Sequence, residues 1–228
     1  MRTWSLKDSA ELYQTANWGA GFFGINEKGH VQVTPRGPEG PAVDLYELLP
    51  SLQARGLRLP LLVRFSDIVS SRVRGLAKSF AKAIGDYSYG GRFRGVYPIK
   101  VNQQRHVVEE IVRYGAPHRI GLEAGSKPEL LIALALLDTP GALLICNGYK
   151  DRSYIETALL AQRLGRTPII VIDRFQELEL AIRISRELGV RPHLGVRARL
   201  TTKSSGRGAD SRGERAELRH PAAAIGEP

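Results

Sequence analysis

The fold is decided by residues 120–189, which read IGLEAGSKPELLIALALLDTPGALLICNGYKDRSYIETALLAQRLGRTPIIVIDRFQELELAIRISRELG. Three short apolar runs in this stretch are each followed by a segment with apolar residues at helical spacing: IGLEA (120–124), ALLICN (142–147) and PIIVID (168–173). The predicted helices are Lys127–Leu137, Arg152–Leu164 and Phe175–Leu188, and Gly189 follows the last as a helix stop. Apolar strands that alternate with helices are typical of a parallel sheet covered by those helices.

Three more apolar runs extend this pattern outward: LLVRF (61–65), GVYPIK (95–100) and HLGVRARL (193–200). From GVYPIK onward the polar residues that close the runs are 23 to 26 residues apart: Lys100, Glu123, Asn147, Asp173 and Arg197. This period favours a (β/α) barrel, although a doubly wound open sheet shares the alternation. We therefore predict an α/β fold built around part of a (β/α)8 barrel.

The chain divides into three parts that differ in length and composition. Residues 1–60 contain a predicted hairpin around Asn26–Gly29, flanked by extended runs between Trp18 and Pro35, and then a connecting segment. Residues 61–202 hold the predicted barrel segment. Residues 203–228 are poor in apolar side chains other than alanine, so we expect this tail to be disordered or loosely attached. Because it leaves no sequence for the remaining barrel strands, we expect the chain to be a fragment, produced by a frameshift, by a wrongly assigned gene end or from a degraded gene copy.

Composition limits the possible settings and partners. The 228 residues carry a formal net charge of +10 and one cysteine, Cys146, which cannot form an internal disulfide. No apolar run approaches the roughly 18 to 20 residues that a bilayer crossing needs, and the first residues lack a secretion signal, so we expect a cytoplasmic protein without a membrane partner. The basic residues are scattered and no zinc-finger spacing or aromatic RNA platform accompanies them, so we expect no nucleic-acid partner.

The carboxyl ends of the strands are the first place to look for a site, because barrel chemistry gathers there. Lys100 follows an apolar run; partial desolvation of such an amine would favour its neutral form, which can attack a carbonyl. The alternative is a lysine that reaches into solvent. Glu123 either binds a ligand or pairs with Arg197 or another cation, and Asn147 either contacts a ligand or caps the helix that begins near Asp151.

Other polar residues along the chain have simpler interpretations. We predict that Asp173 caps the next helix and that Lys127 and Lys150, each at a helix start, are solvated. The five histidines join no evident metal set, and Cys146 is interpreted as a buried packing residue.

Local motifs resemble the alanine racemase-like, fold-type III decarboxylases that use pyridoxal phosphate. VYPIKVNQ resembles their lysine strand, and GLEAGSKPEL, ICNGYKD and VIDRFQELE resemble their next three strands in order. The longer forms WGAGFFGIN, LLVRFSDI, GVYPIKVNQQ, IGLEAGSKPELL and CNGYKD are similar to the biosynthetic arginine decarboxylase family. The resemblance covers about residues 4–207.

The resemblance implies conversion of L-arginine to agmatine and CO2 for putrescine and spermidine synthesis, with magnesium as a second cofactor and a homo-oligomeric enzyme. It implies that Lys100 holds pyridoxal phosphate as a Schiff base, with Glu123 and Arg197 near the cofactor ring. We take Asn147, from its place at a strand end, as a further candidate cofactor contact. It also implies that the N-terminal β elements, including LLVRF, belong to a second, β-rich domain. We expect the isolated chain to be inactive. The alternatives are a non-catalytic carrier of pyridoxal phosphate and a basic protein that binds phosphate or nucleic acid.

Overall fold

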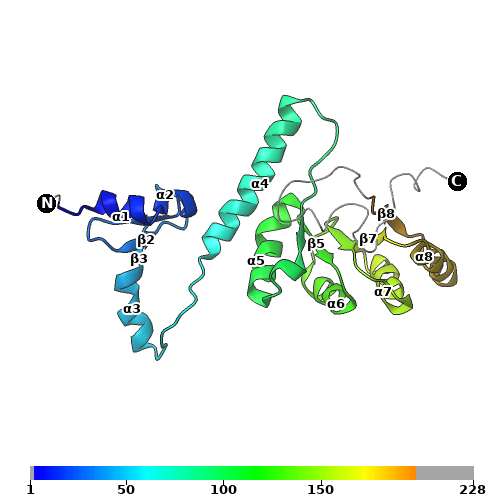
Figure 1. Ribbon diagram of the computed structural model, residues 1–228. Helices are drawn as coiled ribbons and strands as arrows, with labels where there is room; N and C mark the ends of the chain where they lie inside the picture. Colours follow the sequence, from blue (N-terminus) through cyan, green and yellow to red (C-terminus); the bar gives the residue numbers. More distant parts are fainter. Residues whose placement is uncertain (1–2, 199–228) are drawn as a thin grey trace. The chain divides into compact units, whose positions relative to one another are not determined.

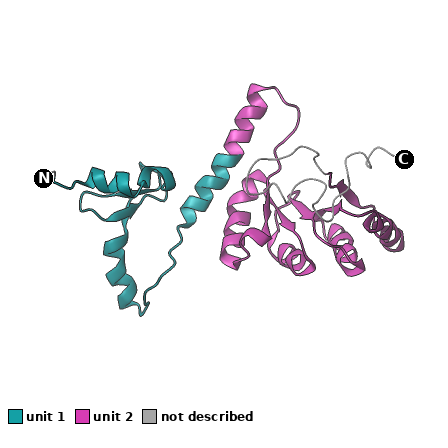
Figure 2. Ribbon diagram, viewed as in Figure 1, with its two compact units in different colours: residues 1–76 teal, residues 77–228 magenta. Residues whose placement is uncertain are grey.

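A computed structural model describes residues 3–198, which form two compact units. One unit runs up to Leu76 and the other begins at Ala77, so their boundary lies within the long helix α4 (Ser66–Asp86) (Figure 2). The predicted tail, residues 203–228, lies outside the described residues. No helix among the described residues is long and apolar enough to cross a membrane.

The first unit contains a small antiparallel sheet and short helices. Strands β1 (Phe23–Ile25), β2 (Val31–Val33) and β3 (Val43–Asp44) pair in that order, and helices α1 (Leu6–Leu12), α2 (Thr15–Trp18) and α3 (Leu45–Ala54) accompany them. The predicted hairpin is confirmed. Its turn depends on Asn26, whose side-chain oxygen accepts hydrogen bonds from the backbone N–H groups of Lys28 and His30, and on Gly29, whose φ is +81°.

The predicted strand LLVRF is wrong. Residues 61–65 have no regular secondary structure, and Leu62 is 76% exposed. A strand needs a neighbour to receive its backbone hydrogen bonds, and the pairings among residues 3–198 include none for this segment. An apolar run alone does not supply that neighbour.

The second unit is built on five parallel strands in sequence order: β4 (Val96–Pro98), β5 (Gly121–Ala124), β6 (Leu143–Cys146), β7 (Thr167–Ile172) and β8 (His193–Val196). Helices α5 (Arg105–Gly115), α6 (Lys127–Leu136), α7 (Arg152–Arg163) and α8 (Phe175–Leu188) lie side by side against the sheet (Figure 1), and the 3-10 turns η1 (Ile99–Val101) and η2 (Ala116–His118) complete the unit. The strand order never reverses, as it would at the switch point of a doubly wound sheet. This strand order indicates a partial (β/α) barrel, as predicted, and not a doubly wound sheet.

Alternation along the strands separates two faces of the sheet. Leu122, Leu144 and Ile170 are buried under the helices, where they pack in one apolar core with Tyr154 and Ile184. The intervening residues form the other side, here called the inner face, on which Glu123, Ile145 and Ile169 lie in register on adjacent strands. A side chain that ends a strand on the inner face therefore points away from the helices, toward the inside of the barrel.

The sequence located α6, α7 and α8 to within one residue at each end. The helix Phe175–Leu188 has the predicted bounds, and Gly189 ends it in the left-handed conformation, with φ +63°. Strand β4 is shorter than predicted, because the chain enters the turn η1 before Lys100. Strand β8 is also shorter than HLGVRARL, whose last two residues lie outside the described part of the chain.

Candidate functional site

Lys100 and Glu123 meet at the carboxyl end of β4 and β5. Lys100 Nζ lies 3.6 Å from Glu123 Oε1, and their side chains are 61% and 14% exposed, respectively. Of the two alternatives for Lys100, the structure favours the lysine that reaches solvent: β4 is half-buried and pairs only with β5 among the described strands, and Lys100 lies in the turn η1. The cation beside Glu123 is Lys100 and not Arg197, which pairs with Asp173.

The buried oxygen of Glu123 is able to accept a hydrogen bond that no described residue donates. Glu123 Oε1 is inaccessible to solvent and accepts no hydrogen bond from the described residues, although Lys100 lies within ion-pair distance. A buried acceptor without a donor is uncommon and points to a ligand or a mobile partner. A primary amine that can condense with an aldehyde, beside such a carboxylate, fits the demands of a pyridoxal cofactor.

Asp173 and Arg197 form a second polar pair at the carboxyl ends of β7 and β8. Arg197 Nη1 lies 3.7 Å from Asp173 Oδ2, and Asp173 Oδ1 is buried without a hydrogen-bond donor among residues 3–198. The predicted helix cap is wrong, because Arg174 occupies the N-cap of α8 and that cap has no side-chain hydrogen bond. The Asp173 carboxylate instead faces the cation on the neighbouring strand.

Asn147 lies at the corresponding position after β6. Its backbone N–H donates to the carbonyl oxygen of Ala124 at 2.8 Å, which extends the parallel pairing by one residue. It does not cap α7; that role belongs to Asp151, whose side chain accepts from the backbone N–H of Tyr154 at 2.7 Å. Strand alternation assigns Asn147 to the inner face, together with Glu123.

A buried ion pair behind this edge was missed by the sequence analysis. Lys150 Nζ lies 3.2 Å from Glu177 Oε2, with side-chain exposures of 0% and 5%, so the prediction of a solvated Lys150 is wrong. Lys127 is exposed, as predicted. Helical spacing could have revealed the pair in the sequence. Glu177 shares one face of α8 with the buried residues Ala181 and Ile184, and an acidic side chain on an apolar face needs a partner.

Cys146 is structural, as predicted. Its side chain is fully buried on the helix-covered face, and burial raises the pKa of its thiol to about 12. The neighbouring Tyr154 donates its hydroxyl hydrogen to the carbonyl oxygen of Ala124 at 3.0 Å, and burial also raises the pKa of this tyrosine.

One cluster in the first unit has donor atoms close enough to share a metal: His30, Asp44 and Glu47, whose ligand atoms all lie within 4.8 Å of one another. These side chains already have protein partners. His30 Nδ1 contacts Asp44 Oδ2 at 2.9 Å, Asp44 caps α3, and Glu47 pairs with Lys28. These contacts join the hairpin to α3, which explains the cluster without a metal ion.

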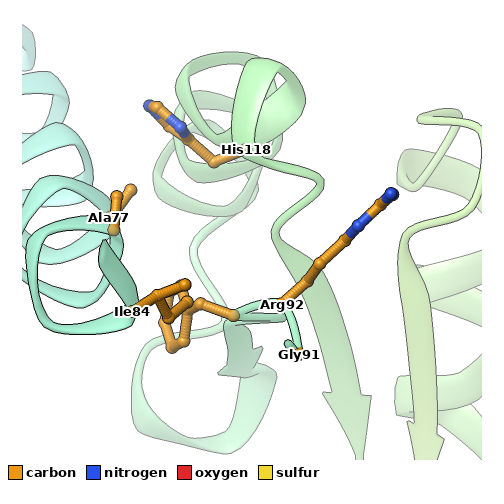
Figure 3. A pocket seen from close by; sticks show the side chains of 7 residues that line it. Ala77, Ile84, Gly91, Arg92 and His118 are labelled. Atoms are coloured by element: carbon orange, nitrogen blue, oxygen red, sulfur yellow. The ribbon is translucent and has the colours of Figure 1, made fainter. Parts of the chain in front are cut away.

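A cavity of about 320 Å³ lies elsewhere in the second unit (Figure 3). It is lined by residues of α4, of the segment before β4, and of η2, among them Ala77, Ile84 and His118, while the Arg92 side chain points away from His118. Its lining residues include neither a carboxylate nor a lysine. This cavity therefore lacks the groups that the strand ends provide.

Comparison with known proteins identifies the family. Residues 70–216 match the family model described as pyridoxal-dependent decarboxylase, pyridoxal binding domain. The chain belongs to this family. The resemblance found in the sequence is confirmed, and Lys100, Glu123, Asn147 and Arg197 all lie within the matched residues of this pyridoxal-binding domain.

Individual relatives agree with the family. The chain is 59% identical to the biosynthetic arginine decarboxylase of Gloeobacter violaceus over 96% of its own length and 34% of the relative's. The crystal structure of the biosynthetic arginine decarboxylase from Campylobacter jejuni matches 85% of this chain and 32% of that one, with 32% identity and a TM-score of 0.75. Diaminopimelate decarboxylase from M. jannaschi, at 18% identity and a TM-score of 0.68, covers 91% of this chain and 43% of that one and shares the fold. The chain spans about a third of the length of the arginine decarboxylases it matches.

Proposed function

We propose that this chain provides the pyridoxal phosphate-binding barrel segment of an arginine decarboxylase, which converts L-arginine to agmatine and CO2 in polyamine synthesis. The observation that carries the proposal is the pairing of Lys100 with Glu123 at the carboxyl end of the barrel wall, in a chain 59% identical to a protein named biosynthetic arginine decarboxylase. Residues 61–202 are the proposed cofactor-binding segment.

Each site residue has a proposed task in this reaction. Lys100 supplies the amine for covalent attachment of the cofactor, and Glu123 can take the proton that an ammonium group must lose before it attacks an aldehyde. Arg197, which is partly exposed, offers a cation to an anionic group of the ligand, and Asn147 offers an amide on the inner face. When bound, pyridoxal phosphate accepts the electron pair that remains on the α-carbon after CO2 departs.

We further propose, on family resemblance, that the enzyme depends on magnesium, forms a homo-oligomer and is cytoplasmic. Magnesium is bound in proteins by oxygen ligands, commonly carboxylates and water. Glu123 and Asp173, at two of the strand ends, each have a buried carboxylate oxygen that accepts no hydrogen bond from the described residues.

Covalent trapping tests the attachment residue. The 228-residue chain is mixed with pyridoxal phosphate, reduced with borohydride and digested, and the pyridoxyl group is located by mass spectrometry. We expect the label on Lys100, its loss in Lys100→Arg, and its retention in Lys127→Arg, which alters another exposed lysine that follows a strand end. A label confined to a different lysine in the unaltered chain would refute the assignment.

Competition tests the substrate. Because a bound amino acid would engage the cofactor in place of Lys100, L-arginine should reduce the labelling of Lys100 at concentrations where L-ornithine and L-lysine have little effect. Agmatine, measured by chromatography, is the expected product wherever turnover occurs. Equal competition by the three amino acids would contradict the choice of arginine.

A further inference from the structure

The buried pair of Lys150 and Glu177 connects two loops that carry site residues. Glu177 Oε2 accepts from Lys150 Nζ at 3.2 Å and from the backbone N–H of Asp173 at 3.0 Å, and Glu177 Oε1 accepts from the backbone N–H of Lys150 at 3.3 Å. Lys150 Nζ also donates to the carbonyl oxygen of Gly148 at 2.6 Å. One carboxylate in the first turn of α8 therefore holds the loop after β6 and the loop after β7.

The residues held in this way adjoin the candidate site. Asn147 directly precedes Gly148, and Asp173 is the residue whose carboxylate contacts Arg197. Gly148 has φ +76° and lies so close to Gly125, after β5, that a Cβ at Gly148 would be 1.9 Å from the Gly125 carbonyl oxygen. The backbone is thus closely fixed from the end of β5 to the end of β7, along the edge where Glu123 and Asn147 emerge.

Stability alone does not account for a pair of this kind. Burying two charges costs so much solvation that well-packed apolar residues of similar size are often as stable or more stable. What an ion pair with additional hydrogen bonds does provide is direction, because each bond fixes a donor and an acceptor. The fixed groups here are backbone atoms of Gly148, Lys150 and Asp173.

We infer that Lys150 and Glu177 are positioning residues for the cofactor site: they set the backbone at the carboxyl ends of β6 and β7 so that Asn147 and the Asp173–Arg197 pair face the inner side of the barrel wall. This inference rests on the proposed function. Both residues act through the backbone groups of the loops that they hold.

The test compares two double variants of the full chain. Lys150→Met/Glu177→Met removes the buried pair while keeping side-chain volume and leaving no unpaired buried charge. Arg152→Met/Glu187→Met is the matched control, because it removes an exposed ion pair that also connects the start of α7 with α8. If the buried double variant does not fold, Glu177→Gln takes its place, since glutamine keeps the shape and one acceptor oxygen.

The first readout is backbone amide hydrogen exchange without cofactor, at Asn147 and Arg197. Their N–H groups donate to Ala124 and Ile172, not to Glu177, so their exchange reports the geometry of the site rather than the deleted bonds. We expect faster exchange at both positions in the buried variant and wild-type exchange in the control. Unchanged exchange at Asn147 and Arg197 in a folded buried variant would overturn the inference.

The second readout is the dissociation constant for pyridoxal phosphate, measured by the same borohydride labelling of Lys100. Because the loss of one hydrogen bond to a charged ligand group corresponds to roughly tenfold or more in affinity, we expect binding at least about tenfold weaker in the buried variant and unchanged in the control. Equal affinity in the two variants would also overturn the inference. If the wild-type chain binds no cofactor, the proposed function fails, and the exchange at Asn147 and Arg197 still decides whether the pair positions this edge.

Discussion

Replacing Lys150 alone should destabilise the second unit far more than replacing an exposed lysine or arginine. Lys150→Met leaves the Glu177 carboxylate 5% exposed, with two backbone N–H donors and no cation. Breaking a buried pair in this way typically costs about 3–5 kcal/mol, whereas an exposed pair contributes about 0–1 kcal/mol. For a unit of this size, about 2–4 °C per kcal/mol gives a fall in melting temperature of roughly 6–20 °C.

Urea unfolding followed by far-UV circular dichroism measures these differences in a double-mutant cycle. Lys150→Met and Glu177→Met are each made alone and together, beside the same cycle for Arg152 and Glu187. The double Lys150→Met/Glu177→Met variant should regain most of the stability lost in Lys150→Met, because no buried charge remains unpaired. A loss below about 1 kcal/mol in Lys150→Met, or a double variant less stable than both singles, would refute the assignment of a buried, mutually dependent pair.

Three further predictions concern single residues. Gly148→Ala should destabilise the chain by at least about 2 kcal/mol, and by more than Gly165→Ala, because both glycines have positive φ but of the two only Gly148 has a backbone atom where the Cβ would lie. Equal losses of stability in thermal unfolding of the two variants would contradict this. Cys146, whose pKa burial raises to about 12, should resist iodoacetamide at pH 8 in the native chain and react in urea, so equal rates in the two states would show that the thiol is exposed. Burial would raise the pKa of Asp44, but hydrogen bonds from His30, the Glu47 backbone and Asn26 together lower it to about 2. The stability that this carboxylate contributes is then present above its ordinary pKa near 4 and is lost as the pH falls through about 2, which NMR titration of the carboxyl group, with His30→Ala as comparison, can check.

Much of the fold was predictable because its signals are local. The helix Phe175–Leu188 carries its own periodicity and ends at a glycine that supplies the left-handed turn, and the apolar runs of β5, β6 and β7 need only their composition to be seen as strands. The candidates Lys100 and Glu123 followed from their positions at strand ends, together with the family motifs around them. Their approach to 3.6 Å required the sheet.

The errors share one physical cause, which is that exposure and pairing depend on neighbours distant in sequence. Lys150 seemed solvated because it precedes a helix, but α8 brings Glu177 to it from 27 residues away. The apolar run at 61–65 has no strand partner among the described residues. The sequence left open whether Lys100 reaches solvent, and it does so where β4 pairs only with β5 among the described strands.

Amino-acid order alone determined the helices that follow β5, β6 and β7, the presence of strands β4 to β8 and the residues that close them, since these depend on spacing along the chain. Tertiary structure decided the rest: the unreversed order of strands that makes a barrel wall, the choice of Lys100 as the cation for Glu123, and the burial of the Lys150–Glu177 pair. A charge is stabilised by whatever lies within a few ångströms of it, and only folding brings residues from separate strand and helix units to that distance.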